Sequence, residues 1–322
     1  MIRVGIIGMG FMGGVHFRNW QALDDAQVVA VCDANPIAGK AKQGNIDTGD
    51  SELNLDGVAV FTDVADMLAT ETLDAVSIAL PTHLHKSVTI QCLEAGVHVL
   101  CEKPMALSVE DCDAMIAAAS AAGKQLMVAQ CIRFWPAYAW LKSVVESNAF
   151  GAVKVADFSR LTYAPAWSDA SWISDPSKSG GMALDLHIHD LDYIQYLFGP
   201  PAAVESDCAY LENGVPGHSV TRVDYGAGKV VTATASWMMP KSFGFSMAFK
   251  VVFEKAAVVL DGNGVTVYPA EGEAYAPEIE PGDGYRGEIE YFASLVKGQA
   301  EVVVITPEQA RESVRMAWET MK

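Results

Sequence analysis

The strongest constraint on this chain is the spacing of three glycines near its start, Gly8, Gly10 and Gly13, in the pattern G-x-G-x-x-G. The mainly apolar residues 3–7 before them predict a buried parallel strand, and residues 15–23 after them predict a helix. In such a unit the first glycine permits a tight turn. The second lets a ligand approach the backbone, and the third lets helix and strand pack closely. The pattern therefore predicts a helix N-terminus that can bind a phosphate.

An acidic residue follows where a dinucleotide-binding unit needs one. Asp33 ends the apolar stretch 28–32, 20 residues after Gly13, and a carboxylate there can accept hydrogen bonds from both ribose hydroxyls. It would repel the 2′-phosphate of NADP, and the next basic residue is Lys40. We therefore expect NAD to be preferred over NADP by at least about tenfold. The competing interpretation is a tight glycine turn and a solvated aspartate.

The charge of the chain limits its partners. It has 22 Lys and Arg against 40 Asp and Glu, a net charge of −18, which argues against nucleic acid or an anionic membrane as a partner. No apolar run approaches the roughly 20 residues of a membrane span, and no charged leader precedes an apolar segment. The six cysteines form no C-x-x-C pair, so we expect buried free thiols in a reducing cytoplasm.

Strand and helix patterns alternate over the first 130 residues. This alternation predicts an α/β fold with a parallel, doubly wound sheet of the Rossmann type. Five further strands are expected there, at residues 28–33, 58–61, 74–80, 98–101 and 125–130. Helices are expected at residues 64–69, 83–95 and 108–122, and a weak helix with a loop at 40–51.

The pattern changes after residue 130. A helix at 136–147 is followed by strands with few helices between them, which predicts a mostly antiparallel sheet. These strands are expected at residues 153–163, 220–225, 229–237, 245–253 and 257–260. Two helices, 284–296 and 307–321, end the chain. We therefore expect a nucleotide-binding domain at 1–130 and an α+β domain at 131–322 that covers the open edge of the nucleotide site.

Glu102-Lys103-Pro104 directly follows a predicted parallel strand, at the edge where ligands of open α/β sheets bind. A lysine shielded from water there can exchange protons near neutrality, or hold a substrate hydroxyl as a fixed cation. The bond between Lys103 and Pro104 is a candidate for the cis form. A surface lysine in a loop is the competing interpretation.

A second candidate is the helix that follows Gly180-Gly181 and extends to about Phe198. Asp185 and His189 are four residues apart, so they share a face, and a carboxylate beside an imidazole fixes its tautomer and raises its basicity. His187 lies about 200° from Asp185 around the helix, so the three residues would make a poor metal site and we expect no metal. A solvated helix face is the alternative.

The third candidate is Pro81-Thr82-His83-Leu84-His85, at the end of a predicted strand. Its backbone and small side chains could line the nicotinamide, and His85 could reach the site. A helix-capping or surface histidine is the alternative.

These motifs together resemble the glucose–fructose oxidoreductase, inositol dehydrogenase and MocA (Gfo/Idh/MocA) family, and the resemblance covers the whole chain. Further matches are Arg133-Phe134 and, near the end, Tyr285, Glu288 and Phe292. The resemblance implies a Rossmann domain, a second domain with a large open sheet, and NAD(P)-dependent oxidation of a sugar or polyol hydroxyl. It also implies a catalytic set of Lys103, Asp185 and His189.

The resemblance extends to the ligands. It implies cofactor contacts from Gly8, Gly10, Phe11, Met12, Gly13, Asp33, Pro81, Thr82, His85, Glu102 and Lys103. Trp167 and Trp172 precede Gly180 and could stack on a sugar, with packing in a core or interface as an equal alternative. The family usually has glycine where this chain has His187, which is expected to add a bulky polar group beside the substrate.

The expected mechanism is hydride transfer from a secondary carbinol to the nicotinamide. His189, oriented by Asp185, takes the hydroxyl proton, and Lys103 stabilises the developing alkoxide; the two proton roles could be exchanged. Two rival functions are a non-catalytic sugar-sensing regulator and a redox-neutral, NAD-dependent glycoside-cleaving enzyme. We also expect a homodimer or homotetramer, because Val231, Ala233 and Ala235 would give the second domain an exposed apolar sheet face.

Overall fold

The computed structural model describes residues 1–37, 52–165, 172–226, 228–300 and 304–321. The weak helix and loop expected at 40–51 lie outside the described residues. The chain divides into two compact units. The first consists of Met1–Cys131 with Tyr285–Arg311, and the second of Ile132–Gly284 with Glu312–Lys322. The first segment ends at Cys131, next to the boundary expected after residue 130. The chain then returns to the first unit at Tyr285–Arg311, whereas the expected domains were two continuous segments.

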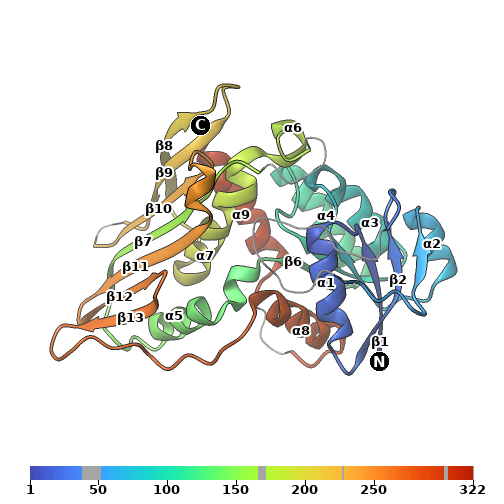
Figure 1. Cartoon of the computed structure of the whole chain (residues 1–322), viewed down its shortest axis with the longest axis horizontal. Helices are drawn as coiled ribbons and strands as arrows, with labels where there is room; N and C mark the ends of the chain where they lie inside the picture. The colour runs from blue at the N-terminus through green and yellow to red at the C-terminus, as the bar shows by residue number, and fades with distance from the viewer. Residues whose placement is uncertain (38–51, 166–171, 227, 301–303, 322) are drawn as a thin grey trace. The chain divides into compact units, whose positions relative to one another are not determined.

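A parallel sheet forms the centre of the first unit (Figure 1). Its strands lie in the order β3-β2-β1-β4-β5-β6, which is the doubly wound order of dinucleotide-binding folds and confirms the predicted class. The strands are β1 (Ile2–Ile7), β2 (Ala26–Cys32), β3 (Ala59–Phe61), β4 (Ala75–Ile78), β5 (His98–Glu102) and β6 (Leu126–Ala129).

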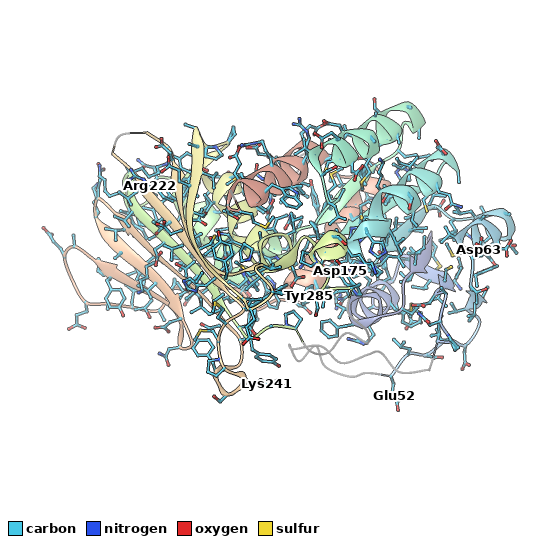
Figure 2. The ribbon with its side chains drawn as sticks, turned by 90° about the horizontal axis from the view of Figure 1, so that it is seen from above. Glu52, Asp63, Asp175, Arg222, Lys241 and Tyr285 are labelled. Carbon is cyan, nitrogen blue, oxygen red and sulfur yellow. The ribbon has the colours of Figure 1, made fainter. Side chains whose placement is uncertain are left out.

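The helices of the first unit begin and end at the residues that favour such ends. Asp63 accepts hydrogen bonds from the backbone N–H groups of Ala65 and Asp66 and so caps α2 (Figure 2). Ser108 caps α4 in the same way, and Gly123 ends that helix in the left-handed conformation. The helices are α1 (Phe11–Gln21), α2 (Val64–Thr70), α3 (His85–Glu94), α4 (Val109–Ala122) and α8 (Gly284–Val296).

A mixed, mostly antiparallel sheet forms the second unit, in the strand order β13-β12-β11-β7-β10-β9-β8. Only the β7–β10 pair is parallel among the described strand pairs. The strands are β7 (Val153–Leu161), β8 (Ala203–Tyr210), β9 (Pro216–Asp224), β10 (Val230–Ser236), β11 (Ser246–Phe253), β12 (Ala256–Asp261) and β13 (Gly264–Pro269). The predicted sheet is confirmed, with β8 and β13 as strands that the sequence analysis did not identify.

One face of this sheet forms the core of the second unit. The rings of Tyr138, Phe158, Tyr193 and Phe249 are fully buried and pack mainly edge to face, with neighbouring centroids 4.8 to 6.2 Å apart. These rings come from β7, β11 and two helices. The helices of this unit are α5 (Pro136–Glu146), α6 (Pro176–Ser179), α7 (Ile188–Phe198) and α9 (Pro307–Glu319), the last beginning in the first unit.

The direction of the side chains in β10 corrects one expectation. Val231, Ala233 and Ala235 are fully buried and belong to the core, so they do not form an exposed face. Because side chains alternate along a strand, the other face of β10 carries Val230, which is 49% exposed, and partly exposed threonines.

Candidate active site

The glycine turn between β1 and α1 has the geometry that its spacing predicts. Gly8 has a φ of +89°, and a Cβ there would lie 2.5 Å from the backbone oxygen of Ala79. A Cβ on Gly13 would lie 1.8 Å from the backbone oxygen of Gly8, so only glycine fits. Nothing lies within 4 Å of a Cβ built on Gly10. Helix α1 begins at Phe11 without a side-chain cap, so its first N–H groups face this open position.

Asp33 lies beside this turn, directly after β2. Its Oδ2 accepts a hydrogen bond of 2.7 Å from the backbone N–H of Met9, and its Oδ1 accepts one of 2.8 Å from the backbone N–H of Asn35. The carboxylate is partly exposed. It therefore remains available to ribose hydroxyls at the strand end where a dinucleotide-binding fold needs an acid.

Thr82 and His85 follow β4 at the same edge of the sheet, and both are buried. His85 Nδ1 lies 2.8 Å from the backbone oxygen of Pro104, and Nε2 lies 2.8 Å from that of Leu80. Its imidazole thus connects the loop after β4 to the loop after β5. The burial lowers the pKa of His85, against the effect of the two carbonyl oxygens and of Glu102.

Lys103 is half-buried and directly follows β5. The Lys103–Pro104 peptide bond is cis, as the sequence suggested. The backbone N–H of Lys103 donates a 3.0 Å hydrogen bond to Oε2 of Glu102, whose side chain is buried. The lysine therefore stands at the carboxyl edge of the parallel sheet, the edge that also carries the glycine turn and Asp33.

The sequence analysis did not identify His16, although its position inside a helix on the buried side was a usable signal. His16 is fully buried in α1, and its Nε2 lies 2.9 Å from Oε1 of Glu102. The fully buried Glu288 from α8 completes a cluster in which one ligand-type atom from each residue lies within 4.8 Å of the others. Among the described residues, these three side chains are the group whose spacing would suit a metal ion.

Asp185 and His189 lie in the second unit, on one continuous helical segment. Residues Ala183–His187 form a π-helical turn that runs directly into α7. Asp185 and His189 are partly exposed, whereas the residues between them are buried, so both lie on the exposed side of this segment. π-helical turns often mark functional positions in helices.

His187 faces the opposite way. Its side chain is fully buried, and its Nε2 lies 2.7 Å from Oγ1 of Thr221 on β9. Burial, together with the charge of Arg160, lowers the pKa of His187 to about 3. This corrects the expectation that His187 stands beside the substrate, because the ring is buried against the hydroxyl groups of the sheet.

Two buried Arg–Asp pairs hold α7. Both nitrogens of the Arg133 fork lie 2.7 Å from the Asp192 carboxylate, and Arg160 on β7 binds Asp190 at 2.9 and 3.2 Å. Such paired contacts are strong and fix geometry. Seven residues after Asp185, Asp192 would share its face in a regular α-helix, but Asp192 is fully buried and pairs with Arg133.

The remaining predicted residues contribute less. Trp172 is partly buried against a cluster that includes Met182, Leu186 and Trp237, which favours its packing interpretation. Trp167 lies outside the described residues. Pro81 begins the loop after β4 next to Thr82, and Phe11 and Met12 open helix α1, both partly exposed.

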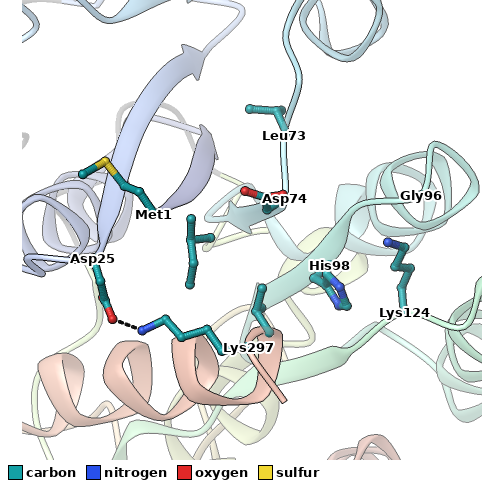
Figure 3. A pocket seen from close by; sticks show the side chains of 10 residues that line it. Met1, Asp25, Leu73, Asp74, Gly96, His98, Lys124 and Lys297 are labelled. Atoms are coloured by element: carbon teal, nitrogen blue, oxygen red, sulfur yellow. Dashed lines mark hydrogen bonds and ion pairs between the residues drawn. The ribbon is translucent and has the colours of Figure 1, made fainter. Parts of the chain in front are cut away.

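A pocket of the first unit lies at the other edge of the parallel sheet (Figure 3). It is lined by residues at the amino ends of strands, among them Ile2, Asp74, His98 and Lys124, and an ion pair joins Asp25 to Lys297 beside it. Because dinucleotides bind at the carboxyl ends, this pocket is not the candidate cofactor site. Among the described residues, none of the helices is long and apolar enough to cross a membrane.

The fold and these residues define a dinucleotide-binding protein with a second unit that carries a carboxylate and an imidazole on one helix. Residues 2–130 match the oxidoreductase family with an NAD-binding Rossmann fold (GFO_IDH_MocA), and residues 138–259 match the GFO/IDH/MocA C-terminal domain. The chain belongs to this Gfo/Idh/MocA family, which confirms the resemblance seen in the sequence.

Several relatives show the range of the family. The chain is 27% identical to inositol 2-dehydrogenase of Rhizobium meliloti, over 94% of this chain and 90% of the relative. It is 33% identical to 2,7-anhydro-N-acetylneuraminate hydratase of Mediterraneibacter gnavus, over 60% of this chain but only about half (48%) of that relative's length. The structure of levoglucosan dehydrogenase with NADH and levoglucosan has a TM-score of 0.81 at 23% identity, covering 99% and 96% of the two chains, and so shares the fold.

Proposed function

We propose that this protein is an NAD-dependent oxidoreductase that transfers a hydride between a secondary hydroxyl of a sugar or polyol and the nicotinamide. The observation that carries this proposal is the position of Lys103, a half-buried cation directly after β5 at the carboxyl edge of a doubly wound sheet. Relatives named for inositol and levoglucosan support the substrate class.

The residues of the first unit fit NAD. Gly8 and Gly13 admit no side chain, Gly10 is open, and the uncapped start of α1 offers N–H groups for the pyrophosphate. Asp33 would accept hydrogen bonds from the ribose hydroxyls. When bound, the cofactor supplies the nicotinamide carbon that accepts or returns the hydride.

The proton and charge roles fall to three side chains. In the proposed mechanism, His189 takes the hydroxyl proton of the substrate, and Asp185 orients its imidazole. Lys103 donates a hydrogen bond to the same oxygen and stabilises its negative charge as the hydride leaves. Exchange of the proton roles between Lys103 and His189 gives the same products.

The test is a panel of inositols, pentoses, hexoses and anhydro sugars with NAD, followed by NADH absorbance. We expect one class to reduce NAD, and Lys103→Met to lower kcat by about 10²-fold or more. Binding of NADH to the variant should stay within about twofold of wild type, since the glycine turn is unchanged. Lys124→Met, at the amino edge of the sheet, is the matched control. Wild-type turnover by Lys103→Met would remove this lysine from the catalytic set.

A second candidate function is redox-neutral, with bound NAD reduced and reoxidised within one turnover. It is favoured by the relative named as a hydratase of an anhydro sugar acid. Product formation from a glycoside or anhydro sugar, without net NADH, would identify it. A sugar-sensing regulator would bind sugar and NAD but give neither product nor NADH.

We also propose a homodimer or homotetramer that uses the open face of the second unit's sheet. Val252, Val155 and Val230 lie side by side on neighbouring strands β11, β7 and β10, and each is 37 to 49% exposed. Such a row is unusual on a sheet face that remains in water. Light scattering at micromolar concentration should give a multiple of the chain mass, and a monomer would contradict this proposal.

The six free cysteines, five of them buried, support a reducing compartment, and we propose the cytoplasm.

A further inference from the structure

We propose that two buried histidines, His16 and His85, are positioning residues that hold Lys103 between them. His16 acts through the carboxylate of Glu102, and His85 acts through the carbonyl oxygen of Pro104. The inference rests on the proposed function, because it takes Lys103 as the group that contacts the reacting oxygen.

The first support comes from helix α1. An ionised carboxylate only accepts hydrogen bonds, so in the 2.9 Å contact between His16 and Glu102 the hydrogen lies on Nε2 of the histidine. The other oxygen of Glu102 accepts the backbone N–H of Lys103 at 3.0 Å. The carboxylate therefore joins the helix after the glycine turn to the backbone of the lysine.

Charge strengthens this contact. Glu288 adds a second carboxylate from α8, and both carboxylates and the imidazole are buried. Two adjacent buried carboxylates repel each other, and a hydrogen-bond donor between them offsets part of that cost. The hydrogen bond from His16 therefore helps to fix where the Glu102 carboxylate lies.

The second support comes from the start of α3. His85 is almost fully buried and lies within 2.8 Å of two carbonyl oxygens, those of Leu80 and Pro104. A neutral imidazole has one N–H and donates to one carbonyl at a time, while the protonated ring donates to both. In either state the ring fills the space between the two loops, and Pro104 is bonded to Lys103.

One contact therefore acts on the peptide unit before Lys103, and the other acts on the peptide unit after Pro104, one residue further along. The N–H of Lys103 is held through Glu102, and the carbonyl of the following residue is held through His85. These contacts fix the backbone of Lys103, from which the proposed mechanism has the side chain contact the substrate. Precise placement matters because a displacement of about 1 Å at a reacting group can lower the rate by about 10²-fold.

The test uses paired variants at each histidine. His16→Gln and His85→Gln keep an N–H donor, whereas His16→Leu and His85→Leu remove it. We expect kcat to fall in the order wild type, Gln, Leu, with a loss of about tenfold or more in the Leu variants and an unchanged affinity for NADH. Equal kcat in the Gln and Leu members of both pairs would overturn the proposal.

His98→Gln is the matched control, since His98 lines the pocket at the amino edge of the same sheet (Figure 3). Its Nδ1 accepts a hydrogen bond from the backbone N–H of Gln125. This control substitution should leave kcat unchanged. If the Leu variants do not fold, the kcat values of the Gln variants test the proposal. Each should then lower kcat by about threefold or more at wild-type NADH affinity, and wild-type kcat in both contradicts the proposal.

A second readout needs no substrate. Amide hydrogen exchange at Lys103 should be faster than in the wild type by about tenfold or more in His16→Leu. The increase should be smaller in His16→Gln, and the exchange rate should be unchanged in His98→Gln. Unchanged exchange in the His16 variants would overturn the His16 half of the proposal. Lys103→Met is assayed in parallel. If it is fully active, the proposed function fails, whereas an inactive Lys103→Met with fully active histidine variants defeats only this inference.

The same three side chains could instead hold a cation. A stoichiometric metal in the purified protein, whose removal by a chelator speeds exchange at Lys103, would replace the hydrogen bond from His16 with metal coordination and overturn its assigned role.

Discussion

The carboxylate of Asp33 binds two backbone N–H groups and is also proposed to bind the ribose of the cofactor. Because its two oxygens already accept hydrogen bonds from Met9 and Asn35, replacement by alanine would loosen the glycine turn as well as change ribose recognition. Asparagine keeps an oxygen that can accept from Met9 but removes the negative charge. The two substitutions therefore separate the electrostatic role of the carboxylate from its structural role.

We predict that the wild type prefers NAD over NADP by at least about tenfold, roughly 1.4 kcal/mol. Asp33→Asn should narrow this preference by relieving repulsion of the 2′-phosphate, and Asp33→Ala should also weaken binding of both cofactors. Fluorescence titrations with NADH and NADPH give the four dissociation constants of the variants. Equal kcat/KM for both cofactors in the wild type would show that Asp33 does not face the ribose.

At the scale of elements, the π-helical turn and α7 are fixed by polar contacts on their buried side. His187 bonds Thr221, whose Oγ1 also lies 2.7 Å from Oγ of Ser206. Asp190 and Asp192 are paired with arginines. Since the buried side is fixed in this way, the exposed side presents Asp185 and His189 in one orientation.

The pKa of His187 gives a pH prediction for this element. In the folded protein it is about 3, against its usual 6.5 in an unfolded chain. Between these two pH values the unfolded state binds more protons at this ring than the folded state does. The contribution of the neutral ring to the free energy of unfolding is therefore fully present above pH 6.5 and is lost as the pH falls toward about 3. The contribution of this ring to the slope is on the order of 1 kcal/mol per pH unit.

His187→Gln should flatten that slope, because glutamine does not titrate but can still bond Thr221. Urea unfolding followed from about pH 4 to 8 measures it. The exposed His83 provides the control, and His83→Gln should retain the wild-type slope. If the slopes of the His187 variant and the wild type coincide, the ring is not kept neutral by burial.

Most helices and strands could be predicted from the sequence because their apolar residues recur with the period of a helix or a strand, and these residues form the buried face. Helix α8, Gly284–Val296, has the expected bounds, and β7 has the expected alternation. Strand β8 was missed because acidic residues such as Glu205 and Asp207 break its apolar pattern at the sheet edge. Strand β13 was missed although Asp261-Gly262-Asn263-Gly264 is a recognisable hairpin turn.

The candidate site was predictable only in part. The glycines, Asp33 and Lys103 follow strands whose order is fixed by the fold, so their shared edge could be foreseen. The π-helical turn could not, because the apolar period changes too little over five residues. The contact between His16 and Glu102 joins residues 86 positions apart, a pairing that no local pattern reveals.

On the scale of the whole molecule, cysteine reactivity reports folding. Five of the six thiols are buried, and burial raises the pKa of Cys32 to about 11 and those of Cys92 and Cys112 to about 12. Cys208 on β8 is partly exposed. We predict that a thiol reagent labels only Cys208 quickly in the folded protein and all six cysteines in denaturant.

Counting labelled thiols by mass spectrometry tests this prediction. Cys208→Ser should leave no fast-reacting thiol in the folded chain. Rapid labelling of two or more positions would mean that the first unit opens readily.

The return of the chain to its first unit at residues 285–311 affects when that unit can finish folding during synthesis. Trp20 and Phe292 are fully buried against each other, with ring centroids 6.2 Å apart, so the N-terminal unit lacks part of its core until residues 285–311 exist. At about 5–20 residues per second, the ribosome needs roughly 8 to 30 seconds to synthesise the chain between these segments. During that interval the face of α1 that carries Trp20 is without Phe292, so this part of the core is completed only after residues 285–311 have been synthesised.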